Sequence, residues 1–267
     1  MFGRFGKKRV EWRTYREVVW GTMIALDLPG RTRPYLMAHR GNSARCPENT
    51  LAAFRQAFAD GADILETDLH LSADGVFVCI HDATVTRTTD GSGAVADLTL
   101  DQIKTFSASY GRAGFEAEKI PTLIESMALL PADVALALEL KTDRFLEPDV
   151  CQRLAAVLDA GGVRTRSVVL SFSIARLKAM RRAAPDIPIG YITLSRPVPA
   201  PGCELLGPLW PLLVLNPLYV WTAHRRGQVV CPLDVTPDRR VGLYRRLGCD
   251  AIMTNNPASI APALGKR

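Results

Sequence analysis

Long apolar runs and paired cysteine motifs are both missing from this sequence. No stretch of its 267 residues is apolar over the ~20 positions that a membrane-spanning helix needs, and the most apolar late stretch, residues 199–221, holds too many prolines for one helix. The apolar run at residues 18–26 is short and no small-x-small cleavage site follows it, which argues against a secretory leader. None of the six cysteines belongs to a C-x-x-C pair, and several lie in apolar runs. We therefore expect a cytoplasmic protein with reduced thiols, although the sequence is also compatible with one disulfide bridge.

An excess of positive charge is present only at the N-terminal end. The formal net charge is +6, yet residues 1–40 carry nine Lys and Arg against three acidic residues, and the rest of the chain is neutral. A neutral body argues against a broad nucleic-acid surface, so we expect no nucleic-acid partner. We predict a basic helical extension at residues 1–34, where apolar residues recur at helical spacing: Trp12, Tyr15, Val19, Met23 and Leu26. Such a helix could make a peripheral contact with an anionic membrane, or it could close one end of a larger fold.

Short β-like runs alternate with helical patterns from residue 35 onward. This alternation predicts an α/β fold with a parallel sheet, and the number of units favours one closed (β/α)8 TIM-type barrel over residues 35–267. A Pro- and Gly-rich segment at residues 196–211 is long for a barrel loop and could cover the mouth of a site. The predicted strands cover residues 35–38, 62–71, 76–80, 134–140, 167–172, 187–194, 212–215, 228–235 and 250–253. The predicted helices cover residues 50–60, 100–107, 123–130, 149–160, 174–184, 219–226 and 237–247.

Polar side chains gather where four of the predicted strands end. In a parallel barrel these ends form the catalytic face, and residues two apart on a strand share one side of it. The residues concerned are His39 and Arg40 after the first strand, Glu66 and Asp68 in the second, Glu139 and Lys141 in "LALELK", and Asn255 and Asn256 after the last.

A small β-hairpin is predicted as an insertion after the second barrel strand. Alternating residues flank Asp74-Gly75, which is a strong two-residue turn signal. If these two residues close the hairpin, Ala73 pairs with Val76 and His81 lies opposite Asp68. Opposite residues project from the same face, so this register brings His81 beside the acidic pair.

The combined set predicts a metal-assisted reaction on a phosphate ester. Three carboxylates in one place repel each other unless a cation lies among them, and Ca²⁺ or Mg²⁺ prefers such oxygen ligands, whereas no His and Cys spacing for zinc is present. Basic side chains suit an anionic group such as phosphate, and two imidazoles allow one proton to be taken while another is given. Each residue alone is as easily an ordinary surface or core group, which is how we interpret His70 and His224. It is their joint placement at four strand ends that indicates a site.

At this point the chain resembles the glycerophosphodiester phosphodiesterase family. The resemblance rests first on "HRGNSARCPENTLAAF" and "LETDLHLSADGVFVCIHD", which are the specific blocks. It is supported by "TVTRTTDGSGAVADLTLDQI", "KIPTL", "LELK" and "GCDAIMTNNP", in the family's order from about Tyr35 to Pro257.

The resemblance implies a barrel enzyme that cleaves glycerophosphodiesters to glycerol 3-phosphate and an alcohol. The family is thought to use the neighbouring glycerol hydroxyl as internal nucleophile, giving a cyclic phosphate that water then opens. Residue by residue, the resemblance implies metal ligands at Glu66, Asp68 and Glu139, an acid–base pair at His39 and His81, and substrate contacts at Arg40, Lys141, Glu48 and Asn49. Glu48 and Asn49 would also brace the first loop.

Two departures from the family pattern bear on substrate choice. The family often ends its last strand in T-D, where this chain has Thr254-Asn255, and it often carries a W-T-V-N strand end, where this chain has residues 233–236, "LDVT". Trp210 or Trp221 could replace the missing aromatic wall. A lysophospholipase D-like enzyme acting on membrane lysolipids therefore stays an alternative, and so does a catalytically silent phosphodiester-binding barrel.

Overall fold

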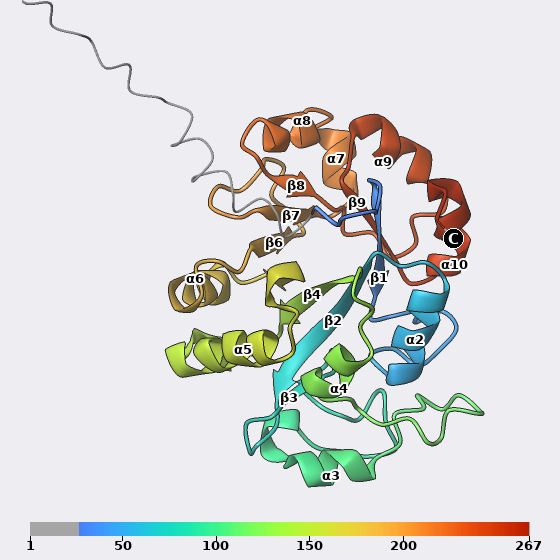
Figure 1. Cartoon of the computed structure of the whole chain (residues 1–267), viewed down its shortest axis with the longest axis vertical. Helices are drawn as coiled ribbons and strands as arrows, with labels where there is room; N and C mark the ends of the chain where they lie inside the picture. The colour runs from blue at the N-terminus through green and yellow to red at the C-terminus, as the bar shows by residue number, and fades with distance from the viewer. Residues whose placement is uncertain (1–26, 267) are drawn as a thin grey trace, which may run out of the picture.

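The fold is a parallel barrel with helices on its outside. The computed structural model describes residues 27–266, so the predicted N-terminal helix falls largely outside the described residues. Among these residues no helix has both the length and the apolarity needed to cross a membrane. Eight strands follow one another around the sheet in the order β8-β7-β6-β5-β4-β2-β1-β9 (Figure 1). Their bounds are β1 Tyr35–His39, β2 Ile64–Leu71, β4 Ala135–Leu140, β5 Ser167–Ser171, β6 Ile189–Thr193, β7 Leu205–Pro208, β8 Val229–Val230 and β9 Ala251–Thr254.

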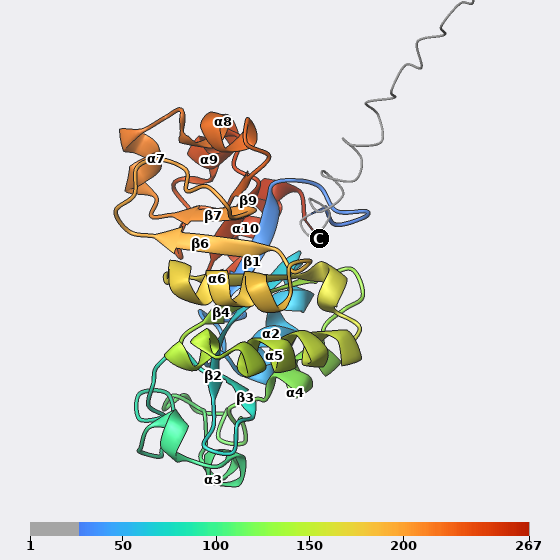
Figure 2. The ribbon, with the colours of Figure 1, turned by 90° about the vertical axis from the view of Figure 1, so that its left-hand side faces the viewer.

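Helices connect these strands, and most of them pack on the outside of the barrel (Figures 1 and 2). Most of them agree with the predicted ranges to within a few residues, because caps and apolar faces define them locally. The helices are α2 Leu51–Ala59, α3 Leu100–Thr105, α4 Leu123–Ala128, α5 Pro148–Ala160, α6 Ile174–Ala183, α7 Pro211–Leu215, α8 Tyr219–His224, α9 Val241–Leu247 and α10 Pro257–Ile260. Short 3-10 turns are η2 Val95–Asp97, η3 Asp143–Leu146, η4 Arg164–Arg166 and η5 Ala261–Leu264.

The seam between β8 and β9 is closed by Asp250. Its backbone N–H donates to Val230 O at 2.9 Å, and its carboxylate accepts from Val230 N at 2.8 Å. The same carboxylate accepts from Arg33 at 2.7 Å and His224 at 2.8 Å. One side chain thus joins the first and last thirds of the chain.

Two buried layers lie on the two faces of the sheet. The layer inside the barrel is made mainly of aliphatic side chains and reaches Leu28, whose N–H donates to the Tyr35 hydroxyl at 3.0 Å. The outer layer packs β2, β4 and β5 against α5 and α6. Leu28 shows that the segment before β1 already contributes to the barrel core, although we predicted the barrel domain to begin at residue 35.

The strand predicted at residues 212–215 is wrong, because this segment is helix α7. The real strand, β7, lies inside the stretch that we interpreted as a Pro- and Gly-rich loop. Pro208 ends β7, where proline is tolerated, and Pro211 begins α7, where its missing N–H costs nothing. A short apolar run cannot be assigned to helix or strand by periodicity alone. Similarly, the predicted strand 228–235 is cut to Val229–Val230, two residues before Pro232.

The hairpin forms where it was predicted, but its predicted register is wrong by one residue. The antiparallel partner β3 Phe77–Cys79 pairs Leu69 with Cys79 and Leu71 with Phe77. Ser72 N–H donates to Val76 O at 3.0 Å, so three residues close the turn, with Gly75 at φ 80°. A three-residue loop with a left-handed glycine is the next commonest hairpin connection after the two-residue turn. Asp68 therefore faces Ile80, to which it is hydrogen bonded, and not His81.

Candidate active site

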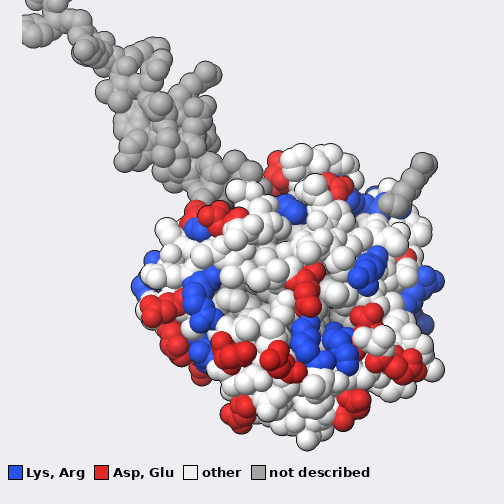
Figure 3. All heavy atoms as spheres, turned by 60° about the horizontal axis from the view of Figure 1, so that its bottom comes forward, with Lys and Arg blue, Asp and Glu red and all other residues white. Residues whose placement is uncertain are grey.

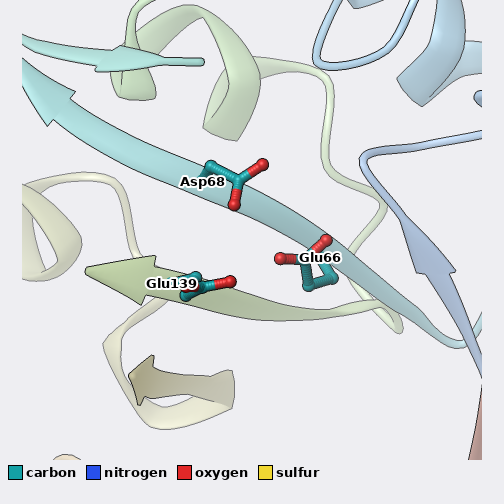
Figure 4. A group of neighbouring side chains, drawn as sticks. All are labelled: Glu66, Asp68 and Glu139. Atoms are coloured by element: carbon teal, nitrogen blue, oxygen red, sulfur yellow. The ribbon is translucent and has the colours of Figure 1, made fainter. Parts of the chain in front are cut away.

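Three buried carboxylates converge at the end of the barrel where β2 and β4 finish. Glu66 and Asp68 project from β2, and Glu139 projects from β4 beside Asp68, its partner in the sheet register. Figure 4 shows the three side chains turned towards one another. One oxygen from each lies within 4.8 Å of the others, and none of the three residues is more than 7% exposed.

Two cations and one amide compensate part of this negative charge. Arg40 Nε lies 3.1 Å from Asp68 Oδ2, and Lys141 Nζ lies 2.9 Å from Glu139 and 3.6 Å from Asp68. Asn49 donates from Nδ2 to Asp68 at 2.9 Å and accepts from Thr67 at 2.8 Å. The structure thus brings Arg40 and Lys141 to the acids, and it also brings Asn49 there, for which the resemblance implied a substrate contact and a role in bracing the first loop.

The compensation is uneven, and the acids therefore differ in their pKa values. Burial and the neighbouring charges of Asp68 and Glu139 raise the pKa of Glu66 well above its usual value. Burial and Asp68 likewise raise the pKa of Glu139. Burial also raises the pKa of Asp68, but the charges of Arg40 and Lys141 outweigh it and leave that pKa below its usual value. A cation held between the acids would offset both the cost of burying their charges and the repulsion between those charges.

The donor set itself fits a hard divalent cation. All three ligands offer carboxylate oxygen, the type that Ca²⁺ and Mg²⁺ prefer. Asp68 Oδ1 is buried and accepts no hydrogen bond from any described residue, so one lone pair in the centre of the group is uncommitted. Among residues 27–266 this is the one group of acidic, His or Cys side chains close enough to hold a metal ion.

The turn after β1 places Arg40 against this cluster. Arg40 lies at φ 56° and Gly41 at φ 79°, so the chain reverses sharply as soon as the strand ends. The reversal directs Arg40 N–H at Glu66, whose backbone and carboxylate oxygens it meets at 3.0 Å. A Cβ on Gly41 would lie 2.6 Å from the Ala53 backbone of α2, so only glycine fits there. Thr50 caps α2 by accepting from Ala53 N at 3.2 Å.

His39, the last residue of β1, is held by a partner from the other end of the chain. Its Nδ1 lies 2.6 Å from Asn255 Oδ1, and since an amide oxygen only accepts, Nδ1 carries the proton. Nε2 is then the basic nitrogen. Burial and the Arg40 charge lower the pKa of His39 to about 4. The sequence analysis noted Asn255 at a strand end but assigned it no contact with His39.

His81 is held by an acidic neighbour and lies at the edge of the cluster. Its Nδ1 meets Asp82 Oδ1 at 2.6 Å, and its backbone oxygen accepts from His70 Nε2 at 3.2 Å. Although the predicted register is wrong, the imidazole still acts electrostatically on Asp68 and Glu139. A third of its side chain is exposed, so the ring can be reached from solvent.

Two functional candidates, Asp82 and Arg87, were missed in the sequence analysis. Arg87 donates to Asp82 at 2.6 Å and to Glu48 at 2.8 and 3.0 Å, and Glu48 in turn accepts from Arg40 at 2.9 Å. Charges of alternating sign thus run in one chain from Arg40 to His81. Asp82 follows His81 directly, and Arg87 lies in "TVTRTT", so both were inside quoted family-like blocks. The sequence did not indicate the contact between Arg87 and Glu48, because these two residues are 39 positions apart.

The aromatic residues expected near the mouth lie in two different places. Trp210 follows β7 and lies under the Arg240 guanidinium, 4.4 Å from the ring centre, and Arg240 also pairs with Asp234. Trp221 is on α8 and is 57% exposed.

On the face drawn in Figure 3, acidic and basic side chains lie next to one another and form no large field of one sign.

Comparisons with known proteins agree on one family. Residues 39–259 match the model of the glycerophosphoryl diester phosphodiesterase family. The glycerophosphodiester phosphodiesterase of Caldanaerobacter subterraneus subsp. tengcongensis is 33% identical over 243 residues, which are 84% of this chain and 95% of that one. A probable glycerophosphodiester phosphodiesterase 1 of Mycobacterium tuberculosis is 34% identical over 250 residues, covering 84% and 90%. A solved Oleispira antarctica phosphodiesterase, in complex with the product sn-glycerol-3-phosphate, superposes with a TM-score of 0.77 at 26% identity, covering 87% and 97%.

Proposed function

Because this chain belongs to the glycerophosphoryl diester phosphodiesterase family, we propose that its barrel mouth hydrolyses glycerophosphodiesters to glycerol 3-phosphate and an alcohol. The observation that carries the proposal is the meeting of three carboxylates with Arg40 and Lys141 at the ends of β1, β2 and β4, with His39 as the last residue of β1. A relative that binds sn-glycerol-3-phosphate as product supports the same reaction.

Glu66, Asp68 and Glu139 would hold one divalent cation, Ca²⁺ or Mg²⁺. When bound, such an ion would neutralise the acids and polarise the phosphoryl group. Arg40 and Lys141, which now pair with these acids, would then be able to turn their donors towards phosphate oxygens. Glu48 and Asn49 would position these groups through hydrogen bonds. Glu48 accepts from Arg40, and Asn49, which is 2% exposed, donates to Asp68.

His39 and His81 would move the protons of the reaction. With Nδ1 bound to Asn255, neutral His39 presents a basic Nε2 that can take the proton of the glycerol hydroxyl. That oxygen forms a bond to phosphorus while the bond to the alcohol oxygen breaks. His81, whose Nδ1 is bound to Asp82, would give the alcohol its proton from Nε2. In the second step water opens the cyclic phosphate, and the two imidazoles exchange roles.

An internal nucleophile is favoured because its translational freedom is already lost when the diester binds. The chain's contribution is therefore mainly orientation. Asp82 and Arg87 would serve as positioning residues, since they hold His81 and Glu48 and need not touch the substrate.

The test is release of glycerol 3-phosphate from glycerophosphocholine. We expect EDTA to abolish it and Ca²⁺ or Mg²⁺ to restore it, and we expect His81→Asn to lower kcat by about 10²–10⁴-fold. His224→Asn is the matched control, because His224 is partly exposed and pairs with Asp250 at the β8–β9 seam. Full activity of His81→Asn, or full activity of the wild type in EDTA, would contradict the proposal. No turnover by any protein, the wild type included, would favour a silent binding barrel.

A lysolipid substrate is the second candidate, favoured by exposed apolar side chains on α7 and α8. An enzyme of this kind would release choline from lysophosphatidylcholine faster than it releases glycerol 3-phosphate from glycerophosphocholine. If the lysolipid is not turned over, this candidate is excluded and the first is unaffected.

We also propose a reducing, cytoplasmic location. All six cysteines are free, and five of them are buried. Burial raises the pKa of Cys79 and Cys203 to about 11, which keeps these thiols protonated and unreactive.

A further inference from the structure

An exposed apolar surface lies on the rim of the barrel, on the side of β6 and β7. Its members are large hydrophobic side chains that are 50–76% exposed. We call it the rim patch; it consists of Leu194, Val198, Val214, Leu215, Leu218 and Trp221. Single exposed hydrophobic residues are ordinary, but several side by side usually mark an interaction surface.

Hydrogen bonds hold the parts of the rim patch together. Asn216, in the turn between α7 and α8, donates from Nδ2 to Pro197 O at 2.9 Å, which brings the turn against the loop that carries Val198. Leu218 N–H donates to Asn216 Oδ1 at 3.1 Å and shapes that turn. Leu218 and Trp221 are three residues apart and therefore lie on one side of the chain at the start of α8. The α7–α8 turn and the loop that carries Val198 are thus held side by side.

The rim patch lies at the same end of the barrel as the acidic cluster. Leu194 directly follows β6, and α7 begins three residues after β7 ends, so both belong to the connections at the carboxyl ends of the strands. Figure 2 shows α7 beyond the end of the barrel to which the arrow of β6 points. A flat surface that covered the rim patch would therefore also lie close to the mouth.

The segment that carries most of the rim patch has basic and no acidic side chains. No Asp or Glu occurs between Glu204 and Asp234, and Glu204 is paired with Arg181. Arg225 lies 5.0 Å above the ring of Trp221, and Arg226 donates to Pro199 O at 2.9 Å beside Val198. An aromatic ring and arginines next to protruding aliphatic side chains are typical of segments that sit at a membrane interface.

We propose that the rim patch docks the enzyme on an anionic phospholipid bilayer. Leu215 and Leu218 would enter the acyl boundary, while Trp221 and Arg225 would lie among the headgroups. An anionic bilayer matches both the exposed apolar side chains and the arginines, since its apolar interior lies beneath a negatively charged headgroup layer. The inference concerns where the enzyme sits and does not depend on the proposed reaction.

The test is flotation of the full-length chain with vesicles of phosphatidylcholine containing phosphatidylserine. We expect the wild type to float and the Leu215→Ser/Leu218→Ser variant to bind at least about tenfold more weakly, because two buried leucine side chains are lost from the acyl boundary. Ile124→Ser is the matched control, because Ile124 is 63% exposed but lies on α4, away from β6 and β7. Every protein keeps residues 1–26, so the basic N-terminal charge is the same in all arms.

Three results would overturn the proposal. The wild type could fail to float; the double variant could float as well as the wild type, which would assign binding to the N-terminal charge; or the wild type could form an oligomer that the double variant abolishes, without vesicle binding. Thermal melting checks the fold of each variant. Should the double variant melt early, the single Leu215→Ser variant replaces it, as that side chain is 76% exposed.

Discussion

At the level of single residues, the site depends on how each imidazole is held. His39 meets a neutral amide at 2.6 Å, whereas His81 meets a carboxylate at 2.6 Å. A carboxylate carries a full negative charge, whereas an amide oxygen carries only a partial one, and burial and the Arg40 charge outweigh the effect of the Asn255 bond on the pKa of His39. The two histidines therefore have different electrostatic surroundings although both donate from Nδ1. Asn255, one of the two departures from the family pattern, is the source of this difference.

Asn255→Asp should raise the pKa of His39 from its present value of about 4. The pKa should rise because the new carboxylate stabilises the protonated ring, which burial and the Arg40 charge disfavour. In the wild type the folded pKa is below the unfolded value of about 6.5, so His39 costs stability as pH falls from about 6.5 to 4. The variant should lose less stability over this range. An NMR titration of the His39 ring in EDTA measures the shift directly, and an unchanged or lower pKa would refute this assignment of Nδ1.

Asn216→Asp is the control, since that amide is far from His39 and bonds Pro197.

At the level of elements, the β1–α2 connection determines where the cationic side chain of Arg40 lies. Gly41 lets the helix pack directly on the turn, with Asn42 N–H donating to Ala53 O at 2.8 Å. Asn49 at φ 54° closes the same loop and returns its N–H to Arg40 O at 3.1 Å. A left-handed residue at each end makes a compact loop that brings the side chains of Arg40 and Asn49 to Asp68.

Gly41→Ala should therefore damage both stability and activity. The added Cβ would need a positive φ and would lie 2.6 Å from the Ala53 backbone, so we expect the free energy of unfolding to fall by about 2–5 kcal/mol. Chemical denaturation measures this loss. Gly242→Ala in α9 is the control: nothing lies within 4 Å of its Cβ position, and alanine favours helix by about 1 kcal/mol. Equal stability of the two variants would show that the α2 contact is not tight.

At the level of the whole molecule, the barrel is held closed by side chains as well as by strand pairing. β8 has two residues, so its edge offers little backbone pairing to β9. Asp250 supplies the missing bonds to Val230, and it also binds Arg33 before β1 and His224 after α8. Asn255, the partner of His39, follows β9, so closure of this seam also supports one contact of the candidate site.

Asp250→Ala should lower the free energy of unfolding by about 2–4 kcal/mol, because it leaves the buried Val230 N–H without its acceptor and removes the carboxylate that Arg33 and His224 share. Thermal unfolding of the metal-free protein measures the loss. Asp238→Ala, at an exposed position before α9, should change stability by less than about 0.5 kcal/mol. A stable Asp250→Ala variant would mean that backbone pairing alone closes the barrel.

The sequence by itself determined the fold class, the polar residues at the strand ends and the acidic cluster. These follow from local rules: the alternation of strands and helices, and the two-residue period that puts Glu66 beside Asp68. The tertiary structure alone decided the hairpin register, the identity of β7, the bond from His39 to Asn255 and the link from Arg87 to Glu48. The reason is physical, since each of these depends on which of several locally acceptable conformations lets distant segments pack and bond. A three-residue turn and a two-residue turn are both allowed at Asp74-Gly75, and only the packed sheet selects between them.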